Sequence, residues 1–397
     1  MTDAAVTELK TAAKSPAVIR LELLERAASL VPVLRERTAK AETLRRCPEE
    51  TVADLAAAGL LRICQPARFG GHELPWDVLC EVSRVLARGC GSQAWVGNIY
   101  CDHTQLLGMF ELEAQADVWG EDPDARLSAS VEPAGTARPV PGGFVFSGRH
   151  RYASGIDYAH WLLCGGHLHE DGKPPRRSFY LVPKSDVTVI DDWHVIGLAG
   201  TGSKSFEVKE AFVPAHRMLD GDQHDEGMGP GSAVNRAAVF RMPRHDIAGT
   251  GFAAVALGVA EGLFDEYVKY TRTRQSRGAA VSEQMGTQIA TGNSAAELLA
   301  ASRLILGAAR EAMAVLERGE RLATEQRQRT RLSAAFGAQL ILAAAQRLFN
   351  GAGSRALFLD SAMQRYMRDL YAVAAHRSLA WDSSAANYGA LLLGIAP

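Results

Sequence analysis

The chain has 397 residues, of which 47% are hydrophobic and 22% are charged, as in an ordinary soluble globular protein. Its 43 Lys and Arg residues and 45 Asp and Glu residues give a net charge of −2, so no strong field exists to bind nucleic acid or acidic lipid. This length predicts two or three subdomains. The acidic, polar start of the chain and the shortness of its apolar runs predict a cytoplasmic protein without a signal peptide or a membrane span.

The first third of the chain has the pattern of helices. Apolar residues recur there at spacings of three and four, as on one face of a helix. We expect helices near residues 16–31, 47–58, 76–87 and 92–107. The six cysteines include no Cys-x-x-Cys pair, which predicts small buried side chains and no structural metal.

Between about residues 126 and 215 the apolar period changes to that of strands. Six short apolar or alternating runs are separated by turns rich in Gly and Pro. Because no helix lies between these runs, we expect antiparallel pairing, and a nucleotide-binding βαβ fold is disfavoured.

A Gly-rich connector at residues 220–232 leads into long Ala- and Leu-rich stretches without proline, which predict a helical bundle. The fold class expected is therefore mostly α with a central β-domain. The expected domains are an N-terminal helical domain (1–122), a central β-domain (123–232) and a C-terminal bundle (233–397).

Three short motifs suggest ligand sites but lack the structural context that such sites need. The G-x-G-x-x-A match at residues 351–356 follows a helical stretch, so a helix–helix connection is expected. The segment 197–205 resembles a phosphate-binding loop, but its lysine is displaced and a strand follows. His167 and His169 lie in an expected hairpin tip, so no metal site is predicted.

Several phrases resemble the acyl-CoA dehydrogenase superfamily, and the resemblance extends over essentially the whole chain. They are SASVEPAG (128–135), FVFSGRHRYASGI (144–156), in which Tyr152 stands where tryptophan is usual, and FVPAHR (212–217). The resemblance implies N-terminal helices, an antiparallel β-barrel or sandwich, and a C-terminal four-helix bundle.

The dehydrogenase base, however, is missing from its usual places. Those enzymes need a carboxylate that removes a proton from a thioester. The last glutamate of this chain is Glu325, and no glutamate lies between Glu226 and Glu261. An acyl-CoA dehydrogenase would therefore need a relocated base, for which Asp246 and Asp382 are the candidates.

A different branch of the fold matches the segment where the dehydrogenases carry their glutamate. Residues 362–377, AMQRYMRDLYAVAAHR, resemble the R-x-x-R-D-x-x-x-x-x-x-H segment of two-component flavin-dependent monooxygenases. That branch includes 4-hydroxyphenylacetate hydroxylase oxygenase components, steroid-degrading phenol hydroxylases and dibenzothiophene monooxygenases. Three further segments, 97–110, 152–161 and 191–208, agree with it.

The resemblance implies a reaction and its partners. A separate NAD(P)H-dependent flavin reductase would supply reduced flavin, as FMNH2 or FADH2, which reacts with O2 to give a C4a-hydroperoxide. One oxygen atom would then pass to a small phenol-like substrate. Relatives form homotetramers built as dimers of dimers, and the apolar helices between residues 299 and 349 have more apolar surface than one bundle needs.

Three residues are the catalytic candidates. Ser154 stands at the family position whose hydroxyl approaches flavin N5. His376 would act as a base that shares the proton of a phenol. His103 would orient the substrate or the oxygenated flavin, or be a core histidine with satisfied hydrogen bonds, two alternatives of equal weight.

The cofactor candidates rest on the resemblance alone. Ser128 and Trp161 would line the isoalloxazine ring, together with Ser154. Arg274, one of three arginines at positions 272, 274 and 277, would meet the flavin phosphate, often from a neighbouring subunit. Trp95, Tyr371 and Met109 are possible substrate-pocket residues, for which core packing is the simpler explanation.

Other functions stay open at this point. A monooxygenase of the same branch that oxygenates nitrogen or sulfur would share most of these phrases. A flavin-free scaffold that keeps the fold for binding is a further alternative from a different class.

Overall fold

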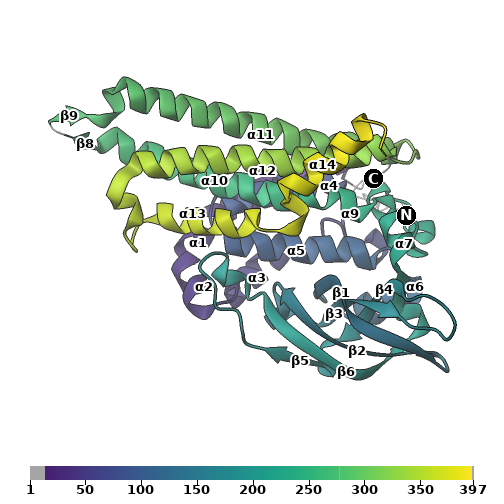
Figure 1. Cartoon of the computed structure of the whole chain (residues 1–397). Coiled ribbons are helices and arrows are strands. Elements are labelled where there is room, and N and C mark those ends of the chain that lie inside the picture. Colours follow the sequence, from purple (N-terminus) through teal and green to yellow (C-terminus); the bar gives the residue numbers. More distant parts are fainter. Residues whose placement is uncertain (1–13, 277, 396–397) are drawn as a thin grey trace, which may run out of the picture.

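The computed structural model describes residues 14–276 and 278–395, and it begins with a helical region (Figure 1). Its helices are α1 (Pro16–Glu36), α2 (Thr38–Leu44), α3 (Glu49–Ala57), α4 (Trp76–Ala87), α5 (Gly91–Leu107) and α6 (Leu112–Trp119). The four helices expected from the apolar spacing are confirmed, and α2 and α6 are additional. The six cysteines are buried and unpaired with one another, as expected.

Helix α5 is buried along its whole length although it carries many polar side chains. All 17 of its residues are buried. A helix of this kind needs a hydrogen-bond partner for each polar side chain, because unpaired buried polar groups are costly. Gln93, for example, accepts from the Thr51 hydroxyl and donates to the Leu34 carbonyl. Because α5 contacts both α10 and the first strand, it carries polar groups into the space between the helical bundle and the sheet (Figure 1).

The central region forms one sheet of seven strands. They are β1 (Leu127–Val140), β2 (Gly143–Ala153), β3 (Trp161–Leu168), β4 (Arg176–Pro183), β5 (Val187–Ile190), β6 (Lys204–Pro214) and β7 (Met218–Asp220). Their order across the sheet is β5-β6-β2-β1-β3-β4-β7. The six expected strands are confirmed, and the short β7 is additional.

The expectation of antiparallel pairing throughout is wrong at one pair, because β1 and β3 are parallel. After the β1–β2 hairpin, the chain crosses the end of the sheet and returns on the other side of β1. Strand β3 therefore runs in the same direction as β1, and the sheet is mixed. Alternation of side chains reveals that a segment is a strand, but it does not reveal which strand lies beside it.

The C-terminal region is a bundle of long helices. They are α10 (Gly249–Thr273), α11 (Met285–Glu317), α12 (Thr324–Ala352), α13 (Ala362–Ala374) and α14 (Trp381–Leu392). Three short helices, α7 (Gly221–Asp225), α8 (Gly231–Val234) and α9 (Arg244–Ile247), connect the sheet to the bundle, and the two-residue strands β8 (Gln275–Ser276) and β9 (Ala279–Ala280) connect α10 to α11. The chain order of helices, sheet and bundle is confirmed, whereas the domain boundaries at residues 122 and 232 stay predictions.

The short motifs lie where the sequence context placed them. Residues 351–356 join α12 to α13, as expected of a helix–helix connection. The segment 197–205 runs into β6 and not into a helix. His167 lies in β3 and His169 directly after it, at the turn toward β4.

Helices α10 and α12 are long and apolar enough to cross a membrane by length and composition. In α10, with the turn before it, 89% of the apolar window is buried inside the protein, so core packing accounts for its composition. In the α12 segment the buried share is 44%, which leaves apolar side chains on the outside of the bundle.

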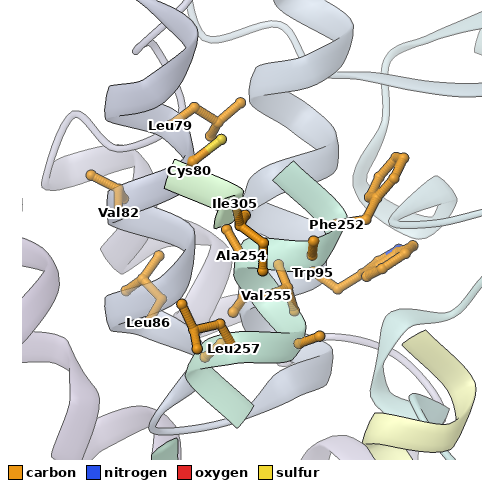
Figure 2. Packing of buried hydrophobic residues seen from close by; sticks show 14 of the residues in the cluster. Leu79, Cys80, Val82, Leu86, Trp95, Phe252, Ala254, Val255, Leu257 and Ile305 are labelled. Atoms are coloured by element: carbon orange, nitrogen blue, oxygen red, sulfur yellow. The ribbon is translucent and has the colours of Figure 1, made fainter. Parts of the chain in front are cut away.

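The main core lies between α4 and α10. Leu79, Cys80, Val82 and Leu86 of α4 belong to this buried cluster, and Figure 2 shows Cys80 on the side of α4 toward α10 and Ile305 of α11. The two helix backbones approach closely at Gly258 of α10. A Cβ atom built there would lie 2.0 Å from the carbonyl oxygen of Arg84 and 2.7 Å from the Cβ of Ala87.

We therefore expect Gly258→Ala to lower the free energy of unfolding by about 2 kcal/mol, because overpacking would push α4 and α10 apart. Gly307→Ala in α11 is the matched control: nothing lies within 4 Å of its added Cβ, so the gain in helix propensity should raise stability by about 0.5 kcal/mol. Urea unfolding at equal protein concentration measures both changes. A Gly258→Ala variant as stable as the wild type would contradict the packing described here.

Candidate active site

Trp95 of α5 brings Ser154 and His376 together from distant parts of the chain. Its indole Nε1 donates to Ser154 Oγ over 3.0 Å. The edge of the same ring packs on His376, with centroids 5.6 Å apart at 62°. Phe252 of α10 completes the cluster, stacked on Trp95 at 4.9 Å and 4.2 Å from the His376 ring centroid (Figure 2). The two principal catalytic candidates therefore share one aromatic cluster, to which Trp95 belongs.

Ser154 follows the last residue of β2 and is held from several directions. Its carbonyl accepts from the Ser128 hydroxyl over 2.8 Å. Its Oγ lies 2.7 Å from Ser203 Oγ, which lies 2.6 Å from Thr201 Oγ1. Thr201 in turn donates to the Leu198 carbonyl over 2.8 Å. The segment 198–203 between β5 and β6 therefore positions the Ser154 hydroxyl.

Helix α13 anchors that segment. Asp369 Oδ1 accepts from the Leu198 N–H over 2.6 Å, and Leu198 adopts a left-handed φ of 53°. Gly197 packs so closely on α13 that a Cβ there would lie 2.1 Å from the Arg368 carbonyl oxygen. Burial raises the pKa of Asp369 to about 7, and the Leu198 N–H opposes this shift.

His376 lies just after α13 and starts a short 3-10 turn, Arg377–Leu379. Its Nδ1 accepts from the backbone N–H of Ser378 over 3.2 Å, so the ring proton is on Nε2. Burial, and next the positive charge of Arg244, lower the pKa of His376 to about 4. The imidazole is therefore neutral near pH 7 and presents an N–H donor at Nε2. The nitrogen with a lone pair is occupied by the Ser378 N–H, and the role of His376 as the base stays a prediction.

His103 carries its ring proton on the other nitrogen, Nδ1. Its Nδ1–H donates to the Leu127 carbonyl over 3.1 Å, so Nε2 carries the lone pair. Burial lowers the pKa of His103 to about 4 as well. Across the part of the chain that the structure describes, Nε2 of His103 has no hydrogen-bond partner. Of the two histidines, His103 is the one that offers a free acceptor.

A buried ion pair that the sequence analysis missed lies beside both histidines. Arg244 of α9 donates through Nε to Asp102 Oδ1 over 2.7 Å and through Nη2 to Oδ2. The side chains are 8% and 1% exposed, respectively. The Arg244 charge contributes to the lowered pKa of His103 and of His376, while Asp102 acts in the opposite sense. Asp102 stands next to His103 in a family phrase, but nothing in the sequence marks Arg244 as its partner.

Of the predicted cofactor residues, Ser128 and Ser154 lie together, joined by a hydrogen bond. Ser128 and Trp161 are on neighbouring strands but point to opposite faces of the sheet, because Ser128 pairs with Leu162 and Trp161 with Leu127. Trp161 packs beneath the Arg217 guanidinium at 4.9 Å. Ser128 and Trp161 therefore lie on different faces of the sheet, and the role of each at the flavin stays a prediction.

Arg274 lies at the far end of α10 from Phe252, and α10 is about 37 Å long. Its Nη1 donates to the carbonyls of Gly351 and Ala352 at the end of α12. Within one chain it is therefore remote from Ser154, and its contact with a flavin phosphate stays a prediction. Arg277 lies outside the described residues.

The remaining site candidates are Met109, Tyr371, Asp246 and Asp382. Met109 is fully buried in the core beside the sheet, and Tyr371 is half exposed on α13. Asp246 is bound by Arg327, and hydrogen bonds from His245 and Arg327 hold the pKa of that carboxyl below its usual value against the effect of burial. Asp382 is exposed on α14. Neither aspartate belongs to the Trp95 cluster, so neither is placed as a dehydrogenase base.

The surroundings of Ser154 fit a flavin. Tyr152 has a φ of 66°, which is unusual for a bulky side chain, and this conformation leaves it 67% exposed with its ring 6.2 Å from that of Trp193. Ile196, two residues before the segment 198–203, is 76% exposed. Exposed aromatic and apolar side chains next to a buried hydroxyl suit a planar ring with a polar edge.

Comparisons with known proteins identify the family to which the chain belongs. Residues 250–381 match the family model described as acyl-CoA dehydrogenase, C-terminal domain. The chain is 34% identical over 351 residues to the oxygenase subunit HsaA, a flavin-dependent monooxygenase of Mycobacterium tuberculosis H37Rv, covering 88% of this chain and 89% of that protein. It is 33% identical over 389 residues to the oxygenase component of an FADH2-dependent resorcinol hydroxylase from Rhizobium sp. MTP-10005, covering 95% of each.

Solved structures give the same result. The 3-HSA hydroxylase from Rhodococcus sp. RHA1 has a TM-score of 0.91 at 31% identity, covering 95% of this chain and 97% of that chain. The dibenzothiophene monooxygenase from Paenibacillus sp. A11-2, with a TM-score of 0.80 at 20% identity, shows the shared fold alone. The resemblance found in the sequence is therefore confirmed, and the chain belongs to the flavin-dependent monooxygenase oxygenase components built on the acyl-CoA dehydrogenase fold.

Proposed function

We propose that this protein uses reduced flavin and O2 to hydroxylate a small phenol, with a separate NAD(P)H-dependent reductase supplying the flavin. The observation that carries the proposal is the cluster in which Trp95 joins Ser154 to His376, with His103 and its free acceptor nearby. Relatives named for phenolic substrates, such as the resorcinol and p-hydroxyphenylacetate hydroxylases, support this substrate class.

Bound reduced flavin would supply the activation of O2. The protein's own groups would bind the phenol and control its proton. His103 Nε2 would accept a hydrogen bond from the phenolic O–H, which raises electron density in the ring, and His376 Nε2–H would donate to the phenol oxygen, which stabilises negative charge that develops there. A donor and an acceptor together suit an O–H group, whereas a thioether or a free amine needs no proton removed. This pairing favours oxygenation of an aromatic carbon.

The test is reconstitution of the reaction. The purified chain, an unrelated flavin reductase, NADH and either FMN or FAD should convert members of a panel of small phenols into hydroxylated products, as followed by mass spectrometry. The chain without the reductase should consume no NADH. Rapid NADH oxidation by the chain alone, or no product from any phenol, would overturn the proposal.

We expect Ser154→Ala to uncouple the enzyme, so that more of the reduced flavin ends as hydrogen peroxide and less as product. Loss of one hydrogen bond in a water-poor site corresponds to roughly a fivefold change in partition. The ratio of product to hydrogen peroxide measures the effect. Ser383→Ala, which removes an exposed hydroxyl on α14, is the control and should leave the ratio unchanged.

We expect His376→Ala to slow product formation by roughly 10²-fold while flavin oxidation continues. Because a phenol ionises near pH ~10, the defect should shrink as pH rises toward that value. In the wild type, titration of His376 should cause no change in rate between pH 6 and 8, because its pKa of about 4 keeps the ring neutral throughout that range.

Single-turnover rates across this pH range provide the measurement, and His376→Gln, which keeps an N–H donor, should recover part of the rate. A His376→Ala variant with the wild-type rate at neutral pH would remove His376 from the reaction.

We also infer a cytoplasmic homotetramer, built as a dimer of dimers. Apolar side chains on the outside of α11 and α12 support assembly, among them Ile289 at 55%, Leu299 at 56% and Phe336 at 41% exposure. The remoteness of Arg274 from Ser154 in one chain agrees with a flavin contact made from a neighbouring subunit. Light scattering at micromolar concentration should give four times the chain mass, and a monomer would refute the inference.

A further inference from the structure

Three hydroxyl groups form a continuous chain that ends on a backbone carbonyl. Ser154 Oγ and Ser203 Oγ are 2.7 Å apart, Ser203 Oγ and Thr201 Oγ1 are 2.6 Å apart, and Thr201 Oγ1 lies 2.8 Å from the Leu198 carbonyl oxygen. All three distances are those of hydroxyl hydrogen bonds. Each hydroxyl has a single proton to donate.

Only one arrangement of the protons satisfies all three contacts. A carbonyl oxygen cannot donate, so Thr201 must donate to Leu198. The proton of Thr201 is then used, so Ser203 must donate to Thr201. The proton of Ser203 is used in the same way, so Ser154 must donate to Ser203. The direction of the whole chain is therefore set by the Leu198 carbonyl.

This direction decides what Ser154 offers to a ligand. Its proton points toward Ser203, and one of its two lone pairs accepts from Trp95 Nε1. The lone pair that remains can only accept a hydrogen bond. Reduced flavin carries hydrogen on N5, whereas N5 of oxidised flavin is a bare acceptor that would face the Ser154 lone pair.

We propose that Thr201 and Ser203 are positioning residues that hold the Ser154 hydroxyl as an acceptor and thereby favour reduced over oxidised flavin. The inference rests on the proposed function, because it requires flavin N5 to lie beside Ser154.

The surroundings of the three hydroxyl groups keep the direction of their hydrogen bonds fixed. Thr201, Ser203 and Ser154 are 1%, 5% and 6% exposed, so water has little access to exchange partners with them. Asp369 fixes the Leu198 peptide through its N–H. The backbone N–H of Gly155 donates to the Thr201 carbonyl over 2.9 Å, which is a second link between the segments that carry Ser154 and Thr201.

The experiment compares the affinities of the two redox states of flavin. The wild type and Thr201→Val are titrated without oxygen with FMN and with FAD, each in oxidised and in photoreduced form, and the ratio of the two Kd values is taken. Valine keeps the shape of threonine but frees the Ser203 proton, so that Ser154 can also donate. The preference for reduced flavin should fall roughly three- to tenfold, as for the loss of one oriented hydrogen bond.

Three further variants make the test specific. Ser203→Ala removes the recipient of the Ser154 proton and should lower the preference in the same way. Thr201→Ser keeps the hydroxyl and should therefore keep the preference for reduced flavin. Thr330→Val removes another buried hydroxyl that donates to a carbonyl, in α12, and should change neither Kd.

The combination with Ser154→Ala separates the inference from the proposed function. If Thr201 acts through Ser154, the Thr201→Val and Ser154→Ala double variant should match Ser154→Ala alone. An unchanged preference in Thr201→Val and Ser203→Ala, with a lowered one in Ser154→Ala, would overturn the inference and leave the role of Ser154 intact. Equal weakening of both flavin states would show a structural role only and would also overturn it. If Ser154→Ala also leaves the preference unchanged, flavin N5 does not lie beside Ser154 and the inference is overturned. The proposed hydroxylation of a phenol would still be tested separately, by reconstitution.

Discussion

The Trp95 indole is the contact on which the rest of the site depends, because its two functional parts engage different regions of the chain. The N–H group binds Ser154 at the end of β2, and the ring surface packs on Phe252 of α10 and on His376 after α13. A side chain with only one of these properties would lose either the hydrogen bond to the hydroxyl or the packing against the imidazole. Tryptophan combines a large apolar surface with one donor, which is the combination required where the sheet meets the bundle.

Burial of polar groups sets the electrostatic character of this site. Asp102 and Arg244 form an ion pair that is shielded from water, and such pairs cost desolvation energy unless their geometry satisfies both partners. Here the pair is bidentate, and it joins α5 to α9 next to both histidines. Burial and the arginine charge together keep His103 and His376 neutral. Both rings can therefore exchange hydrogen bonds with a substrate without first losing a proton.

Periodicity and turn residues were enough to predict the helices, the six main strands and their chain order. The parallel pairing of β1 and β3 was not predictable in this way, because alternation reports faces and not neighbours. Family phrases pointed to Ser154 and His376. Which ring nitrogen carries the proton in each histidine depends on a backbone partner, Ser378 N–H for His376 and Leu127 O for His103. The spacing of residues in the sequence does not reveal these partners.

Other parts of the site escaped prediction for similar reasons. The sequence suggested Trp95 only as a possible pocket residue, for which core packing was the simpler explanation, and did not reveal its contacts with Ser154 and His376. The role of Asp369 depends on how close α13 comes to Gly197, which is a matter of tertiary packing. The Arg244–Asp102 pair joins segments far apart in the chain, and charge patterns along a sequence do not record such partners.

Helix α13 connects the two halves of the site, since Asp369 in its body fixes the segment that positions Ser154, and His376 follows its end. Asp369 also indicates why a neutral ring suits this place. Burial raises the pKa of that carboxyl to about 7, which shows that the surroundings of this helix disfavour a negative charge. An imidazole in such surroundings stays uncharged, since burial lowers its pKa instead. Replacing a carboxylate by histidine here exchanges a base that must carry charge for a neutral hydrogen-bond donor. In the proposed reaction a donor of that kind would bind the phenol oxygen, whereas removal of a proton from a thioester requires the charge.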